Sequence, residues 1–106
     1  MDKLFGSKVR TDALVALARL GPTYVSELAR VIERRPIEVQ RALASLEITG
    51  AVQTRRVGSI RTAELNPRYP EYEGLLDLLL KMSERPDYAR VWKAIRRRPR
   101  AMGKAL

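Results

Sequence analysis

The feature that most limits how this chain can fold is a two-residue turn, Gly58-Ser59, between two β-prone runs. Glycine supplies the positive φ that tight hairpin turns need at their first central position. The sequence therefore predicts a β-hairpin over residues 51–65 in which Arg56 lies directly opposite Arg61. Because like charges paired across strands destabilise a hairpin, we expect these two side chains either to splay into water or to hold an anion between them.

Helical patterns occupy the chain on both sides of this hairpin. Ser7 is a good N-cap, and Gly21-Pro22 ends the first pattern in the order usual at helix C-termini. Pro36 suits the first position of a later helix, because its missing N–H would be unsatisfied there in any case. A short extended piece is expected at 23–24. With apolar residues at helical spacing, these signals predict helices over residues 7–20, 25–34, 36–49, 71–82 and 86–98.

The charge of the chain favours an anionic partner, and its composition excludes several kinds of site. The formal net charge is +9 at pH 7, and residues 81–106 hold nine Lys or Arg against two acids. Such a basic protein favours polyanions, either nucleic acid or an acidic membrane surface. The chain has no Cys and no His, which removes thiolate chemistry, the commonest zinc ligands and the usual general base. We therefore predict no enzyme activity, no metal site and no cofactor.

The length and hydropathy of the chain point to one domain away from membranes. A chain of 106 residues is expected to form a single core. No stretch approaches the ~20 apolar residues of a membrane span, and the N-terminus lacks a hydrophobic region long enough for a signal peptide. A cytoplasmic protein without membrane contact is therefore predicted.

The order of these elements carries the prediction of fold class. Two short helices joined by a tight turn, with the second followed at once by a hairpin, have the layout of a winged helix-turn-helix. We therefore predict a mainly α fold with a small β-hairpin, a winged helix-turn-helix with additional C-terminal helices. Residues 1–69 are expected to form the DNA-binding domain, residues 70–98 to form helices for dimerisation, and residues 99–106 to form a basic flexible tail.

The predicted helix over residues 36–49 has an apolar face and a short-chained, polar outer face that suits a major groove about 12 Å wide. The apolar face consists of Val39, Ala42, Leu43 and Leu46. The candidate DNA contacts on and before this helix are Arg34, Arg35, Gln40, Arg41 and Ser45. Arg41 and Gln40 are placed to reach base edges, Arg toward guanine and Gln toward adenine, whereas Arg34 and Arg35 suit the DNA backbone. The alternative is an ordinary solvated face, which Glu38 favours because its carboxylate repels phosphates unless it accepts a hydrogen bond from a cytosine amino group.

The hairpin supplies the second group of candidate DNA contacts. Arg55, Arg56 and Arg61 surround the turn, and phosphates or a minor groove would neutralise their mutual repulsion. The hairpin is therefore interpreted as a wing. Val57 and Ile60 at its tip are interpreted as a cross-strand pair that stiffens the turn.

Four stretches, in this order and spacing, resemble prokaryotic winged-helix regulators of the ArsR/MarR-like kind. They read LFGSKVRTDALVALARLG, YVSELARVI, VQRALASLEITGAV and RRVGSIRTAELNPRYPEYEGLLDLL. The closest resemblance is to the group with a Leu-Phe-Gly-Ser…Arg start and an Asn-Pro-x-x-Pro segment after the wing, here residues 66–70. It covers roughly residues 4–80.

The resemblance implies a homodimeric regulator whose terminal helices form the dimer interface. In that role the third helix, with Arg35, Gln40, Arg41 and Ser45, reads double-stranded DNA beside the wing. The chain departs from the group in the turn before this helix, which often carries glycine in relatives and here reads Glu33-Arg34-Arg35. Metal-sensing relatives use Cys or His clusters, so their absence argues against a metal response of that kind.

The helix predicted over residues 71–82 supports self-association. Five of its residues between positions 75 and 80 are leucines, too many for one helix face to bury in a small domain. A second surface is therefore expected to cover some of them. The sequence does not indicate which DNA operator the protein would bind or whether a small-molecule effector controls it.

The predicted function is a sequence-specific, double-stranded DNA-binding transcriptional regulator that acts as a homodimer. Two alternatives stay open at this point. One is a protein-interaction or accessory module, antitoxin-like or associated with a nucleotidyltransferase, and the other is an RNA-binding winged helix.

Overall fold

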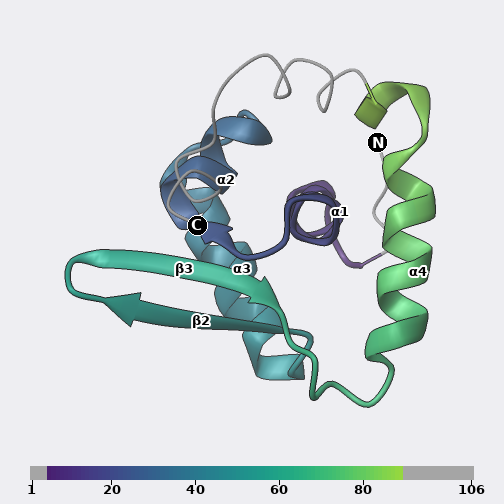
Figure 1. The fold of residues 1–106 in the computed structure, drawn as a ribbon. Helices are drawn as coiled ribbons and strands as arrows, with labels where there is room; N and C mark the ends of the chain where they lie inside the picture. The colour runs from purple at the N-terminus through teal and green to yellow at the C-terminus, as the bar shows by residue number, and fades with distance from the viewer. Residues whose placement is uncertain (1–4, 90–106) are drawn as a thin grey trace.

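The computed structural model describes residues 5–89, and the fold within them is mainly helical with one small sheet (Figure 1). The elements are α1 (Lys8–Leu20), β1 (Thr23–Tyr24), α2 (Val25–Val31), α3 (Pro36–Thr49), β2 (Val52–Val57), β3 (Ile60–Leu65) and α4 (Tyr72–Ser83). The predicted fold class is thereby confirmed. Of the predicted last helix, residues 86–89 are helical; the rest of it and the predicted tail lie outside the described residues.

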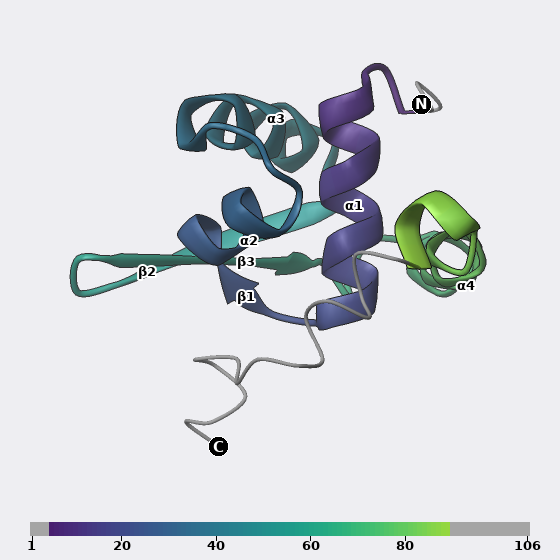
Figure 2. The same cartoon turned by 90° about the horizontal axis from the view of Figure 1, so that it is seen from above.

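Helix α1 begins and ends where its capping residues predict. The Ser7 hydroxyl accepts a hydrogen bond from the Arg10 amide at 3.2 Å, and Gly21 ends the helix with a positive φ of 77°. Every residue from Thr11 to Leu17 is buried, so burial extends well beyond the apolar stripe that helical spacing predicts. The reason is that α1 contacts α2, α3, α4 and β3. Figures 1 and 2 show it between α2 and α3 on one side and α4 on the other.

The sheet contains the predicted hairpin and one further strand. Strands β2 and β3 pair antiparallel with Arg56 opposite Arg61, which is the predicted register, and Gly58 has the positive φ of 64° that the turn requires. The piece predicted only as extended is strand β1, which pairs antiparallel with β3. The strand order is therefore β1-β3-β2, and β2 forms one edge of the sheet.

The turn between α2 and α3 depends on a left-handed residue that is not glycine. Helix α2 ends at Val31, so the predicted end at residues 33–34 is two to three residues too late. Glu33 has a φ of 58° and donates its amide to the Arg30 carbonyl at 3.2 Å, while the Arg34 amide donates to the Ala29 carbonyl at 3.0 Å. These two bonds form a Schellman motif, in which the residue at the Glu33 position is usually glycine.

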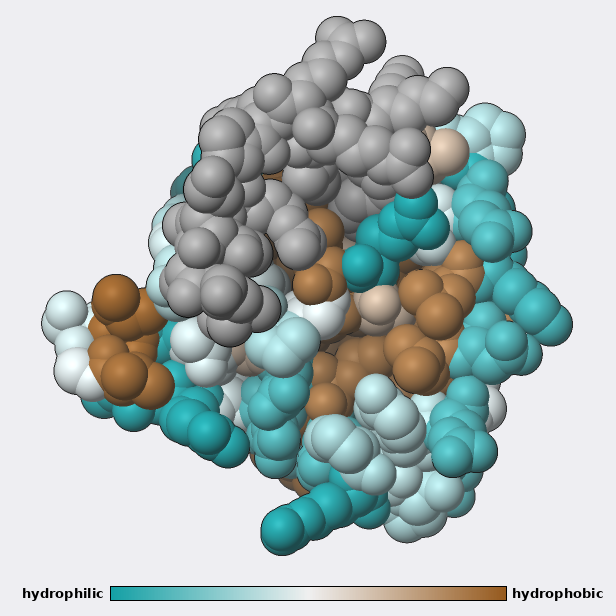
Figure 3. Space-filling model, viewed as in Figure 1, coloured by the Kyte–Doolittle hydropathy of each residue, from teal (hydrophilic) through white to brown (hydrophobic). Residues whose placement is uncertain are grey.

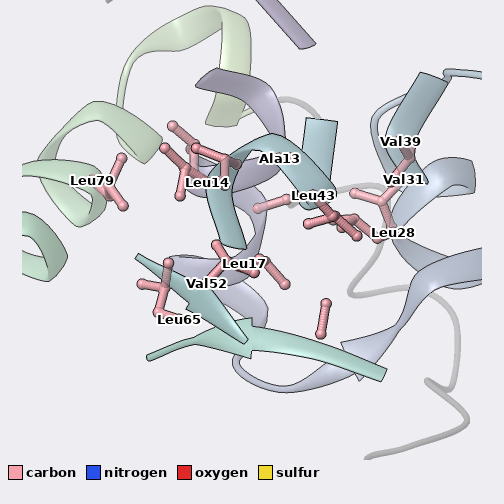
Figure 4. Close-up of a cluster of buried hydrophobic side chains, with 14 of the residues drawn as sticks. Ala13, Leu14, Leu17, Leu28, Val31, Val39, Leu43, Val52, Leu65 and Leu79 are labelled. Atoms are coloured by element: carbon pink, nitrogen blue, oxygen red, sulfur yellow. The ribbon is translucent and has the colours of Figure 1, made fainter. Parts of the chain in front are cut away.

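One hydrophobic core joins the winged part of the chain to α4 (Figure 4). Leu79 of α4 is fully buried in this core together with Leu14 of α1. The chain beyond α4 is also attached to α1, because the Tyr88 hydroxyl donates a 2.6 Å hydrogen bond to the buried Asp12 carboxylate. Leu78, by contrast, is 42% exposed. As predicted, α4 has more leucines than one buried face can hold. The division of the chain into a DNA-binding domain over residues 1–69 and dimerisation helices over residues 70–98 stays a prediction.

Candidate nucleic-acid interface

Helix α3 presents the outer face that its sequence predicts. Pro36 occupies its first turn and Gly50 ends it with a φ of 90°. Its buried residues are Val39, Ala42, Leu43 and Leu46, the four predicted to anchor it. Gln40 and Arg41 are exposed and Ser45 is half-buried. The structure therefore brings these three candidates to the outside of one anchored helix, and their contact with DNA stays a prediction.

The two arginines before α3 are engaged by a carboxylate of the same helix. Arg35 donates through Nε to Glu38 Oε2 at 3.2 Å, and its Nη2 lies 3.1 Å from the same oxygen. Arg34 Nη1 lies 3.7 Å from the other oxygen, Glu38 Oε1. Glu38 thus faces both arginines at once. These ion pairs were not predicted from the sequence, although a spacing of three and four residues between Glu38 and the arginines is the signal for ion pairs on a helix.

The three arginines of the wing do not form one group. Side chains alternate between the two faces of a strand, so Arg56 and its partner Arg61 share a face with the buried Val52, whereas Arg55 lies on the opposite face with Val57. Arg55 and Arg56 are exposed and Arg61 is half-buried. The wing therefore offers a cation on each of its faces.

A polar network that the sequence did not predict links Arg61 to α3 through Thr54 and Glu47. Arg61 Nη2 donates to the Thr54 hydroxyl at 3.3 Å, and that hydroxyl donates to Glu47 Oε2 of α3 at 2.9 Å. The same Glu47 oxygen accepts from the Thr54 amide at 3.0 Å. Arg61 therefore has a hydrogen-bond partner on its own face of the hairpin, the Thr54 hydroxyl. Glu47 attaches α3 to the edge strand β2.

The tip of the wing is apolar. Val57 is 61% exposed and Ile60 is 48% exposed, and they face each other across the turn as predicted. Figure 3 shows apolar surface at this tip and again between α1 and α4. The two tip residues therefore pair with each other while about half or more of each residue's surface stays in contact with water.

The described residues contain no group of three or more His, Cys, Asp or Glu side chains that could hold a metal ion. Within the same residues, no helix is both long enough and apolar enough to cross a membrane. What the chain offers a ligand here is an anchored helix and a basic hairpin, both suited to a polyanion.

Known structures share this arrangement. No protein-family model matches the chain, and no curated protein matches it. The crystal structure of the AntR antimony-specific transcriptional repressor is similar, with 26% identity and a TM-score of 0.63 over 80% of this chain and 75% of that one. The fold is therefore that of a winged-helix transcriptional regulator, a class without enzyme activity.

Two further structures share the fold at lower identity. The YusO protein from Bacillus subtilis has a TM-score of 0.59 at 17% identity, over 88% of this chain and 63% of that one. A mutant form of ZitR from Lactococcus lactis has a TM-score of 0.59 at 11% identity, over 93% of this chain and 66% of that one. The predicted assignment to the ArsR/MarR-like group with a Leu-Phe-Gly-Ser start stays a prediction.

Proposed function

We propose that the chain is a transcriptional regulator that binds double-stranded DNA sequence-specifically as a homodimer. The observation that carries the proposal is the outer face of α3, where Gln40 and Arg41 are exposed and Ser45 is half-buried, next to a hairpin with cations on both faces. In this proposal α3 enters the major groove, where Arg41 and Gln40 contact base edges. The similar AntR structure is that of a transcriptional repressor, which supports a regulatory role.

The remaining candidate residues bind the DNA backbone. Arg34 and Arg35 precede the N-terminus of α3, which is where phosphates meet a recognition helix. Arg55, Arg56 and Arg61 contact phosphates or the minor groove from the wing. The wing can bind without repacking, because Glu47 already attaches it to α3.

Self-association brings two copies of α3 to one DNA duplex. Leu78 is exposed on α4, and apolar surface lies between α1 and α4 (Figure 3). A second copy that covers this surface would produce a two-fold symmetric dimer. Such a dimer would read two half-sites about 34–36 Å apart, one turn of the double helix.

The test is a binding titration by fluorescence anisotropy. The labelled probe is a duplex selected from fragmented genomic DNA by the protein itself, and the competitors are random duplex DNA and double-stranded RNA. Specific binding should exceed random binding by at least about 10³-fold at physiological salt. Equal affinity for selected and random DNA, or equally strong competition by RNA, would contradict the proposal.

A further inference from the structure

The Glu38 carboxylate lies next to the two arginines at the N-terminus of α3. Each oxygen of the Glu38 carboxylate faces a different arginine, Oε1 facing Arg34 and Oε2 facing Arg35. The side chain of Arg35 is nevertheless 78% exposed and that of Glu38 is 30% exposed, so solvent and ligands can reach the pair. Two cations assigned to phosphates are therefore already bound to a carboxylate in the free protein.

Glu38 also belongs to the face that would read bases. Residues three and seven positions further along a helix share its side, and these are Arg41 and Ser45. A carboxylate in the major groove accepts a hydrogen bond from the amino group of cytosine and from no other exposed group of a G·C pair. The amino group of adenine can satisfy the carboxylate in the same way, whereas at guanine or thymine, which offer only acceptors, the carboxylate stays unpaired unless it keeps its arginines.

We infer that Glu38 couples base reading to backbone binding, an inference that rests on the proposed function. On random DNA the Glu38 carboxylate keeps Arg34 and Arg35, which then contribute little to phosphate binding. Where the amino group of cytosine or adenine faces it, the carboxylate accepts that hydrogen bond, and one or both arginines turn to phosphates. Glu38 is thus a specificity-determining residue that acts mainly by lowering affinity for wrong sequences.

The inference predicts a difference in salt dependence within the wild-type protein. Each phosphate contact contributes about 0.9 to the slope of log affinity against log salt, so the slope on the selected duplex should exceed that on random DNA by up to about 1.8 from these two arginines. In Glu38→Ala the arginines are free on every sequence. The two slopes should then become closer by the same amount, and affinity for random DNA at physiological salt should rise on the order of tenfold.

The matched control is Asp77→Ala, which removes an equal charge from an exposed ion pair on α4, where Asp77 Oδ2 lies 3.4 Å from Lys81 Nζ. This control should leave both slopes unchanged. Glu38→Gln retains the size of the side chain without its charge and should reproduce the slopes of Glu38→Ala. The preference for an amino-bearing base at one position of each half-site should be lost in Glu38→Ala, which has no acceptor, and weakened in Glu38→Gln, whose amide oxygen still accepts. Circular dichroism of each variant verifies that α3 is folded.

Two failures are distinguishable. A wild-type protein that binds no duplex DNA would overturn the proposed function together with this inference. A wild-type protein that prefers its selected site, with both Glu38 variants matching Asp77→Ala in random-DNA affinity and salt slope, would overturn the role of Glu38 alone.

Discussion

Replacing Glu33 with glycine should stabilise the fold. Glu33 has a φ of 58°, where a β-carbon is crowded against the following carbonyl oxygen. The left-handed conformation costs a residue with a β-carbon about 1–2 kcal/mol, and the side chain of Glu33 is exposed. Glycine removes this strain while leaving the two amide bonds of the Schellman motif in place.

The magnitude follows from two opposing terms. Glycine increases the conformational freedom of the unfolded chain, which costs about 0.4–1 kcal/mol, so the net gain in free energy of unfolding should be about 0.5–1 kcal/mol. For a domain of this size, that corresponds to a rise in Tm of about 2–8 °C. Urea unfolding followed by circular dichroism measures it, at one fixed protein concentration because self-association changes apparent stability.

Two controls separate the backbone term from the charge. Glu33→Gln retains the β-carbon and removes the charge, so its stability should stay within about 0.5 kcal/mol of wild type. Gly50→Ala imposes the same strain where φ is 90°, in a place where the new β-carbon meets Tyr69 Cδ1 only at 3.7 Å. The same two terms apply with opposite sign, so it should destabilise by about 0.5–1 kcal/mol. If Glu33→Gly is neutral or destabilising while Glu33→Gln behaves as stated, the strain argument is wrong.

Three further predictions concern DNA binding and assembly. Arg41→Ala should cost about 1–3 kcal/mol on the selected duplex and flatten discrimination at one position per half-site in an anisotropy competition assay; an equal loss on random DNA would make Arg41 a phosphate contact. Arg56→Thr should leave stability unchanged or raised by a few tenths of a kcal/mol, and it should make the slope of log affinity against log salt shallower by about 0.9. Arg61→Thr should make the slope shallower in the same way but lower stability, because Arg61 donates to the Thr54 hydroxyl. Unchanged salt slopes in both variants would show that the hairpin is not a DNA wing. Leu78→Glu should yield monomers in analytical ultracentrifugation without unfolding, since Leu78 is exposed, and a wild-type protein that is itself monomeric at tens of micromolar would refute the dimer.

Local signals predicted most of the fold. Ser7, Pro36 and Gly50 act within one helical turn of their own positions, and each begins or ends a helix as expected. Gly58 determines the hairpin register, since a two-residue turn leaves one way to pair the flanking strands. The four anchoring residues of α3 were equally readable, because helical spacing alone places them on one side.

Contacts between distant segments were not readable from the sequence. Strand β1 has only two residues, too few to show the alternation of apolar and polar residues that marks a strand. Its pairing with β3, far along the chain, therefore left no pattern in the sequence. Glu33 has a left-handed backbone conformation, which residues other than glycine rarely adopt. Because nothing in the sequence signals it, the end of α2 was predicted too late. Glu47 and Thr54, which determine the position of Arg61, meet only because α3 lies beside the edge strand.

The central position of α1 has a consequence for how this protein opens. From Thr11 to Leu17 the helix has no side that faces water, and its neighbours α2, α3, α4 and β3 each cover a different part of it. No single neighbour can detach without exposing the apolar surface of α1, so partial unfolding is costly and the described part of the chain behaves as one cooperative unit. The amide hydrogens in the middle of α1 are therefore expected to be the last to exchange with solvent, at the rate of global unfolding.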